Sequence, residues 1–216
     1  MNLVVDIGVT SEDKARSVGV KEGTPITYQP NFATTGVLIK SKSLDNRVGC
    51  TLLAHLAKSC SNPPNTLYLV GTVREEFGYT GVFAACESIR PDIAIVVDVT
   101  FVNDVTPQQH ESLIALGSGP AITMRDGGMI GYPNLVQAFT ELTQSSSIPY
   151  QIEVVEHGVS EAAKTQSIAG GIPSIGVFVL ARGNHIATEI INVRDLEFTV
   201  SLITAAVMSP ALLMTK

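Results

Sequence analysis

The feature that most constrains the fold is a run of five apolar residues, Ile93 to Val97, near the middle of the chain. The run is uninterrupted rather than alternating, which is typical of a strand buried on both faces by helices. A second largely apolar run, Ile175–Leu180, follows later. Segments of strand and helix character alternate around both runs, so the pattern predicts an α/β protein with a three-layer α/β/α sandwich.

The expected elements can be placed along the chain. Strands are expected at Leu3–Asp6, Pro25–Gln29, Gly36–Lys40, Thr66–Val73, Asp92–Val99, Ala121–Met124, Gln151–Glu156 and Ile175–Leu180. Helices are expected at Ser11–Val18, Val48–Lys58, Gly81–Ile89, Pro133–Gln144 and Ala162–Ala169, with a closing helix from Asp195 or Leu196. The polar stretch Thr100–Pro120 is long for a connection and is predicted to be a functional loop. Residues 1–32 are predicted to be a small β-rich segment ahead of the sandwich domain at 33–216.

Composition excludes several classes of protein. With 216 residues and 45% hydrophobic residues, the chain can bury a core and is not disordered. A net charge of −6 argues against a nucleic-acid partner. Polar residues interrupt the apolar stretch from Leu196 to Met214, which indicates a buried helix and no membrane partner. Three cysteines without a CxxC pair and a start without signal-peptide character predict a cytoplasmic protein.

Acidic residues and one histidine fall beside the predicted strand ends, where sites of open α/β sheets collect. They are Asp45, the pair Glu75 and Glu76, Asp98 and His185. Each has an ordinary explanation: a helix N-cap for Asp45, a solvated pair for the two glutamates and a surface side chain for His185. Asp98 is harder to explain in this way, because a carboxylate on a buried strand is costly unless it is paired or binds a metal.

Taken together, these side chains form a set of oxygen and nitrogen ligands typical of a hydrolytic zinc, cobalt or manganese site. An aspartate can bridge two metals through its two oxygens, and two metals about 3.5–4 Å apart can activate one water. A further carboxylate can then act as the general base that accepts the proton of that water.

Several motifs give the chain a family resemblance. It resembles the dinuclear-metal aminopeptidases of the tetrahedral, glutamyl-aminopeptidase and deblocking type, some of which are labelled cellulases. The motifs are Ser43–Gly49 (SLDNRVG), Arg74–Gly78 (REEFG), Pro91–Thr100 (PDIAIVVDVT), Gly117–Ile122, Ile148–Gln151 and Gly170–Ser174. Their order and spacing agree with the family over nearly the whole chain.

The resemblance implies a role for each candidate residue. Asp45 would bridge two metals, Glu75 would be the general base, Asp98 would bind the first metal, and Glu76 and His185 would bind the second. The cofactor would be zinc or cobalt, with manganese as a further possibility, and the substrate would be a peptide.

Two nearby motifs depart from the family pattern. Arg182 belongs to a motif in which Gly183 replaces the usual tyrosine. Glu161 stands where an aspartate is usual, and its side chain is one methylene longer than that of aspartate. Arg182 and Glu161 are therefore predicted to contact substrate, in a pocket altered from the family pattern.

The resemblance also implies that a segment is absent. Family members begin with a His-x-Asp motif whose histidine binds the first metal, followed by an inserted β-rich dimerisation domain. Residues 1–32 resemble only the end of that insertion, and His55, His110 and His157 do not replace the missing ligand convincingly. We therefore expect a weakened first metal position, impaired peptidase activity and an exposed sheet edge. A homo-oligomer is expected, although the large assemblies of the family need not form.

Other functions remain open from sequence alone. A non-catalytic role, as a truncated paralogue or as a split-gene fragment serving in assembly, is the main alternative. A glycosidase is disfavoured because its two carboxylates must flank a sugar bond, whereas Glu75 and Glu76 are adjacent. A phosphate site at Gly117–Pro120 or Asp126–Gly128 lacks the P-loop spacing and its lysine.

Overall fold

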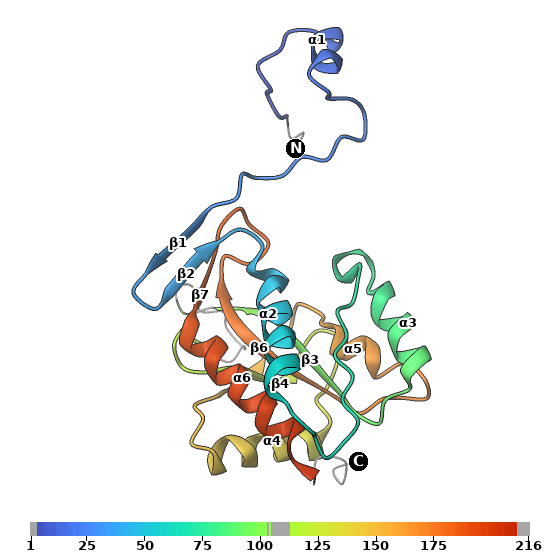
Figure 1. The fold of residues 1–216 in the computed structure, drawn as a ribbon, viewed down its shortest axis with the longest axis vertical. Helices are drawn as coiled ribbons and strands as arrows, with labels where there is room; N and C mark the ends of the chain where they lie inside the picture. Colours follow the sequence, from blue (N-terminus) through green and yellow to red (C-terminus); the bar gives the residue numbers. More distant parts are fainter. Residues whose placement is uncertain (1–3, 103, 105–112, 211–216) are drawn as a thin grey trace.

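A computed structural model describes residues 4–102, 104 and 113–210. Its sheet has seven strands, in the order β1-β2-β7-β6-β4-β5, with β3 paired to β6 on the side of β6 away from β4 (Figure 1). The strands are β1 (Phe32–Thr35), β2 (Leu38–Ser41), β3 (Ala94–Phe101), β4 (Ala121–Arg125), β5 (Gln151–Val154), β6 (Ser174–Arg182) and β7 (Glu189–Asn192). The pairs β3–β6 and β4–β5 are parallel and the others are antiparallel.

Helices cover both faces of this sheet. On one face α2 (Leu44–Ser59), α4 (Pro133–Ser145) and α6 (Val193–Val207) enclose the largest apolar cluster, which includes Leu52, Phe139 and Leu202. On the other face α3 (Thr80–Ile89) packs with residues near α5 (Glu161–Thr165) against Ala94 of β3. The expected three-layer α/β/α sandwich is confirmed.

The central strand is β6, and it is the most deeply buried. All of its residues except Arg182 are buried, and it contacts β3 on one side and both β4 and β7 on the other. Strand β3 is different: most of its residues are only half-buried. Ile93–Val97 contacts apolar clusters on both faces, as expected, but it stays only half-buried, because β6 is the one strand beside it in the part of the chain that the structure describes.

Several expected strand boundaries also change. Residues 4–6 and Pro25–Gln29 belong to no strand, since no second segment lies beside them to complete a ladder. Thr66–Val73 pairs with no strand either, although it was expected to join the sheet. Strand β2 confirms the strand expected at Gly36–Lys40, while β1 and β7 extend the sheet beyond the expected set. Strand β3 continues to Phe101, two residues beyond the expected end at Val99, so Asp98 lies further inside the strand than expected.

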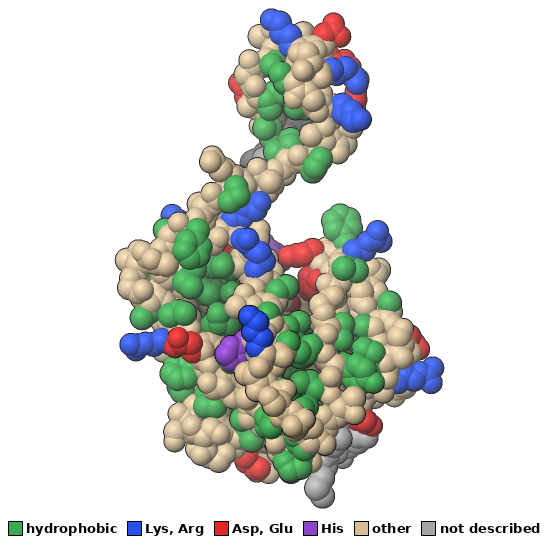
Figure 2. Space-filling view, viewed as in Figure 1, with side chains coloured by type: hydrophobic (Ala, Val, Ile, Leu, Met, Phe, Trp, Pro, Cys, Tyr) green, Lys and Arg blue, Asp and Glu red, His purple; other side chains and the backbone are tan. Residues whose placement is uncertain are grey.

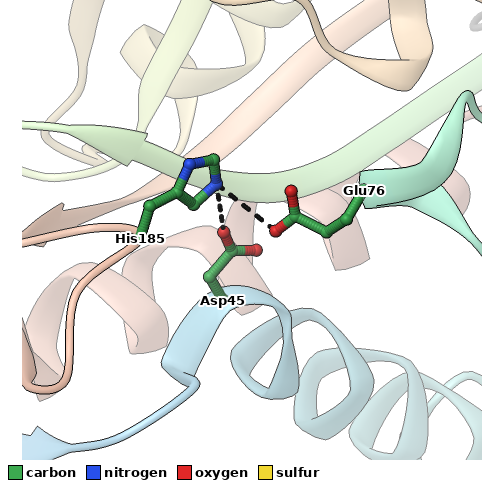
Figure 3. Close-up of side chains that lie close together, drawn as sticks. All are labelled: Asp45, Glu76 and His185. Atoms are coloured by element: carbon green, nitrogen blue, oxygen red, sulfur yellow. Dashed lines mark ion pairs between the residues drawn. The ribbon is translucent and has the colours of Figure 1, made fainter. Parts of the chain in front are cut away.

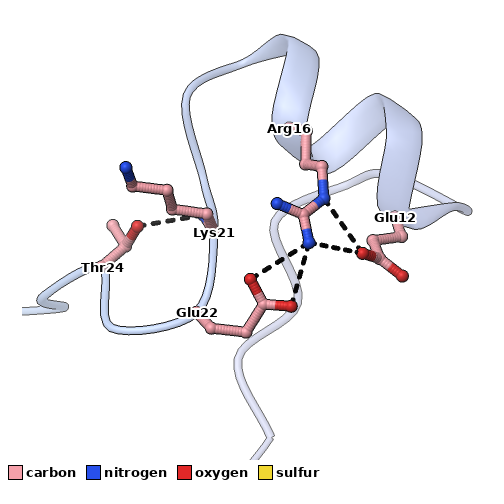
Figure 4. Close-up of polar contacts among 5 residues, drawn as sticks. All are labelled: Glu12, Arg16, Lys21, Glu22 and Thr24. Atoms are coloured by element: carbon pink, nitrogen blue, oxygen red, sulfur yellow. Dashed lines mark hydrogen bonds and ion pairs between the residues drawn. The ribbon is translucent and has the colours of Figure 1, made fainter.

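The first part of the described chain stands apart from the sandwich (Figure 1). It contains the short helix α1 (Glu12–Ser17), whose Ser11 side chain accepts a hydrogen bond from the Lys14 amide. Arg16 joins this helix to the following turn through ion pairs with Glu12 and Glu22, and Lys21 donates its amide proton to Thr24 Oγ1 (Figure 4). These contacts are exposed and contribute little stability.

Apolar side chains are exposed along this first part and at its junction with the sandwich (Figure 2). They include Val4, Val18, Ile26, Tyr28 and Phe32, each more than half exposed. No helix among residues 4–102, 104 and 113–210 combines the length and apolarity needed to cross a bilayer.

Candidate metal centre

Three side chains from distant parts of the sequence meet above one end of β3. His185 Nε2 lies 3.2 Å from Asp45 Oδ2 and 3.3 Å from Glu76 Oε1 (Figure 3). Asp45 comes from the start of α2, Glu76 from the 3₁₀ turn η1 (Glu75–Phe77), and His185 from the loop after β6. Two ligand atoms that bind one zinc ion tetrahedrally lie about 3.3 Å apart, so this spacing fits a metal ion.

The donor set also fits a divalent ion. One atom from each of Asp45, Glu76 and His185 lies within 4.8 Å of the others. The Asp45 side chain is only 13% exposed, whereas those of Glu76 and His185 are 60% and 57% exposed. A catalytic zinc site has three protein ligands and one position open to water or substrate. The exposed side chains of Glu76 and His185 leave this group open on one side, which is compatible with such a site.

The backbone beside each of these residues takes an unusual conformation. Ser43, Arg74 and His185 all have left-handed φ angles, of 55°, 60° and 63°. Such angles are uncommon for residues other than glycine and collect at functional sites. Here they turn the chain sharply just before Asp45 and Glu75 and at the histidine itself.

The backbone amide of Asp45 and the side chain of the next residue link the start of α2 to strands β7 and β3. Its amide donates to Glu189 Oε2 on β7, at 2.9 Å. The next residue, Asn46, donates through Nδ2 to the Val97 carbonyl of β3 and accepts from the Gly49 amide, both at 2.9 Å. A Cβ atom at Gly49 would lie 2.4 Å from Asn46 Oδ1, so a larger residue here would displace the Asn46 side chain from these hydrogen bonds.

Phe101 contacts the histidine. Its ring meets the His185 ring edge to face, with centroids 6.1 Å apart. Sequence reasoning missed Phe101 and Glu189, because neither belongs to a motif and only the folded sheet brings them to the site. Asn46 follows Asp45 in the motif Ser43–Gly49, so this motif could have indicated that Asn46 also belongs to the site.

Glu75 lies beside the three ligands and has an altered acidity. Burial, followed by the charges of Glu76 and Asp45, raises the pKa of Glu75 to about 7. A carboxylate with a pKa near neutrality is suited to accept and return a proton. The metal-free geometry therefore provides a group with the properties of a general base.

Asp98 occupies a second acidic position on β3. Burial is the largest cause that raises its pKa to about 8, and the charge of Asp45 is the next, while a hydrogen bond from the Val99 amide lowers it. It lines the same cavity as Asp45 and Glu75. Asp98 lies outside the group of three ligand atoms, so its side chain belongs to a neighbouring part of the site.

The site opens into a cavity of about 540 Å³. Beside the acidic group, its wall is formed by the end of β3 and by the loop after β5. Asp126 stabilises the far wall, because it accepts hydrogen bonds from the amides of Gly128 and Met129 and from Ser160. This space can accommodate a small organic group next to the acidic cluster.

The remaining predicted site residues lie around this centre. Arg182 pairs with Asp104 at 2.8 Å. Glu161 is buried, accepts from Thr72 Oγ1 at 2.9 Å through one oxygen, and has no partner for the other among the described residues. His157 lines the cavity, His55 is exposed on α2, and His110 lies outside the described residues.

Residues 1–202 match the family of M42 glutamyl aminopeptidases. The chain belongs to this family. A putative aminopeptidase of Acetivibrio thermocellus is 35% identical over 205 residues, which are 95% of this chain and 62% of that relative. The lysyl aminopeptidase of Pyrococcus furiosus is 27% identical, over 94% of this chain and 58% of the relative. The chain thus spans about three fifths of the length of these relatives.

Solved structures agree with this assignment. An aminopeptidase from the archaeon Desulfurococcus kamchatkensis superposes with a TM-score of 0.90 at 28% identity, over 96% of this chain and 60% of that one. A TET aminopeptidase from a marine-sediment thaumarchaeote gives 0.88 at 28% identity, over 94% and 59%. A Thermotoga maritima protein titled an endoglucanase, at 22% identity and 0.72, shares the fold. The predicted family resemblance is confirmed.

Proposed function

We propose that this chain carries the metal site of an aminopeptidase that removes N-terminal residues from peptides. The observation that carries the proposal is the meeting of Asp45, Glu76 and His185 beside Glu75 at the mouth of a cavity. The family match and the aminopeptidase relatives support it.

Asp45, Glu76 and His185 would hold one divalent ion, zinc or cobalt by their chemistry, with manganese as a third candidate. When bound, such an ion polarises the peptide carbonyl and makes water more acidic. That ion corresponds to the second metal of the family, and Asp45 and Asp98 would offer the first metal position through carboxylates alone. That position should bind more weakly, because it has fewer ligands.

Glu75 would supply the proton transfers. Its carboxylate accepts a proton as water attacks the peptide carbonyl, and it returns that proton to the amine that leaves. Glu161 and Arg182 are proposed as groups on the substrate side of the site. The unpartnered, buried oxygen of Glu161 supports an acceptor role toward a cationic α-amino group.

The substitution Glu75→Gln tests this assignment. Because an amide cannot accept the proton, turnover of aminoacyl substrates should fall by about 10²–10⁴-fold. Metal content, measured by mass spectrometry after dialysis, should stay unchanged, whereas His185→Ala should lower it. Glu87→Gln, at an exposed position of helix α3, serves as the control and should leave turnover unchanged. Unchanged turnover in Glu75→Gln would exclude this residue as the base.

The proposal includes an impaired activity, because the described residues offer few ligands to the first metal position. One metal equivalent should survive dialysis. Two retained equivalents would contradict the weak first position. A chain that holds metal but hydrolyses no aminoacyl substrate would instead favour the alternative, a non-catalytic assembly subunit. The edge of β3 away from β6, which pairs with no strand among the described residues, is the observation that supports this alternative.

We also propose a homo-oligomer in the cytoplasm, with residues 1–32 as the remnant of a dimerisation domain. The exposed apolar side chains of that segment support self-association. Sedimentation at several protein concentrations tests it.

A further inference from the structure

Three apolar side chains beside the metal ligands are strongly exposed. Phe77 directly follows Glu76 and is 84% exposed, and Ile186 directly follows His185 and is 62% exposed. Phe101, at the end of β3, meets the His185 ring edge to face and is 55% exposed. We call Phe77, Phe101 and Ile186 the apolar rim. Single exposed apolar side chains are ordinary, whereas a group of them beside a site is typical of a surface that binds a ligand.

The apolar rim lies on the open side of the ligand group. Glu76 and His185 are the two exposed ligands, whereas Asp45 is mostly buried. Neighbouring residues have Cα atoms about 3.8 Å apart, so Phe77 and Ile186 start directly beside the exposed ligands. On the face shown in Figure 2, hydrophobic side chains stand next to acidic ones at the edge of a hollow. A molecule that enters the site from solvent therefore passes the rim.

The position of Ile186 depends on Gly183. Gly183 has a left-handed φ of 76°, and its carbonyl accepts a hydrogen bond from the Ile186 amide at 3.3 Å. A Cβ atom at Gly183 would lie 3.0 Å from Ile186 Cδ1 and 2.8 Å from the Thr188 carbonyl oxygen. The Ile186 side chain therefore packs over the bare backbone of the glycine. Because the family pattern has a tyrosine at this position, an apolar side chain placed in this way is a feature of this chain's own sequence.

The direction of a bound peptide follows from the shape of the site. An aminopeptidase cleaves after the first residue, so a single residue lies on the amino side of the bond. The cavity of about 540 Å³ has room for that residue, and the acidic group lies at its mouth. The remainder of the peptide must leave through the open side, and the second residue is its first part to reach solvent. The side chain of the second residue therefore comes next to the apolar rim.

We propose that the apolar rim binds the side chain of the second residue of a peptide substrate, so that this chain prefers a large apolar residue there. The inference rests on the proposed function and names the substrate class of the same site. The three rim side chains carry no charged or hydrogen-bonding group, so contact with them favours a second residue that withdraws apolar surface from water. A glycine at that place gains little from the contact.

Calorimetry on zinc-loaded Glu75→Gln measures binding without turnover, because this variant lacks the proposed base. The probes are three peptide amides that share an N-terminal residue and continue with phenylalanine, leucine or glycine. The shared residue is the one whose simple amide binds most tightly. Amides are used because a free carboxylate would meet the acidic side chains of the site. The phenylalanine and leucine probes should bind at least about tenfold more tightly than the glycine probe.

Variants of the rim, made in the same background, test which residues supply the preference. Phe77→Ala removes the most exposed member, and the ratio of the dissociation constants of the glycine and phenylalanine probes should fall from about ten to about two. Phe77→Leu keeps an apolar side chain and should retain most of the ratio. Phe83→Ala, at an exposed position of helix α3 outside the rim, is the matched control and should leave the ratio unchanged. An unchanged thermal midpoint confirms that each variant is folded.

Three outcomes would overturn the proposal. The first is equal affinity for the three probes, or no binding of any of them. The second is a preference that survives both Phe77→Ala and Ile186→Ser, because other residues would then supply it. The third is an equal loss of the preference in Phe83→Ala. Failure of the proposed function is a separate result, since it consists of absent turnover by the parent chain whatever the affinities of the probes.

Discussion

At the scale of single residues, the site is defined by carboxylates that have little positive charge near them. The pKa values of Asp98 and Glu75 are raised to about 8 and about 7, in both cases chiefly by burial. Among the described residues, Asp45 and Glu76 form ion pairs with His185 alone. This imbalance makes the metal-free fold sensitive to pH.

The folded metal-free chain binds more protons at these two carboxyls than the unfolded chain does. Their stabilising contribution is complete below about pH 4, near the unfolded values, and is lost as the pH rises toward about 8. The free energy of unfolding from urea titrations should therefore fall between pH 4 and pH 8. A saturating divalent metal should reverse this trend, because it stabilises the charged carboxylates.

The substitution Asp98→Asn shows how much of this pH dependence of stability comes from the Asp98 carboxyl. Without the titrating carboxyl, the decrease of stability with pH should become shallower in metal-free protein. A pH dependence equal to that of the parent chain would show that Asp98 is not the group responsible.

At the scale of elements, the side-chain amide of Asn46 holds the start of helix α2 against the sheet. Asn46 forms a hydrogen bond to β3 and another to its own helix. Asn46→Ala should lower the free energy of unfolding by about 1–3 kcal/mol, because a partly buried carbonyl loses its partner. Metal affinity should fall as well, since Asp45 is the adjacent residue.

The control for this variant is Thr51→Ala, on the exposed side of the same helix. Thr51 only donates to the Arg47 carbonyl within that helix, so its loss should change stability by less than about 0.5 kcal/mol. Equal effects of the two substitutions in urea titrations would contradict the role given to Asn46.

Helix α6 is joined to a loop by a buried carboxylate. Asp195 accepts hydrogen bonds from the amides of Gly117 and Gly119, at 2.7 and 2.8 Å. Asp195→Ala should destabilise the fold by about 2 kcal/mol or more, because two amides lose their acceptor. Glu197→Ala, exposed on the same helix, should leave the thermal midpoint nearly unchanged, and a similar decrease there would argue against a specific role for Asp195.

At the scale of the whole molecule, the sandwich and the first part of the chain are largely independent. Helix α1 contains no buried residue, and its ion pairs lie within its own segment (Figure 4). Deletion of residues 1–24 should therefore change the thermal midpoint of the sandwich by less than about 2 °C. The deletion should also reduce self-association, if the exposed apolar side chains mediate it.

Sedimentation and calorimetry on the same deletion variant check both expectations. A large decrease in the thermal midpoint would show that this segment contributes to the core after all. Unchanged self-association would exclude it as the contact between copies.

The sequence by itself determined the family and the layered α/β architecture, and it drew attention to the acidic residues and the histidine that the structure brings together. Motif spacing and apolar runs are local properties, so they can be detected without coordinates. Ile175–Leu180 was recognised as a strand for this reason, and it became the buried centre of the sheet.

Only the tertiary structure decided which segments pair and which side chains meet. Ile93–Val97 and Thr66–Val73 both have strand character, but whether such a segment finds a hydrogen-bonding neighbour depends on residues far away in the sequence. Likewise, Phe101 and Glu189 reach the site through sheet packing that no local pattern records. The open edge of β3 is the clearest example, because an unpaired strand and a paired one can have the same sequence.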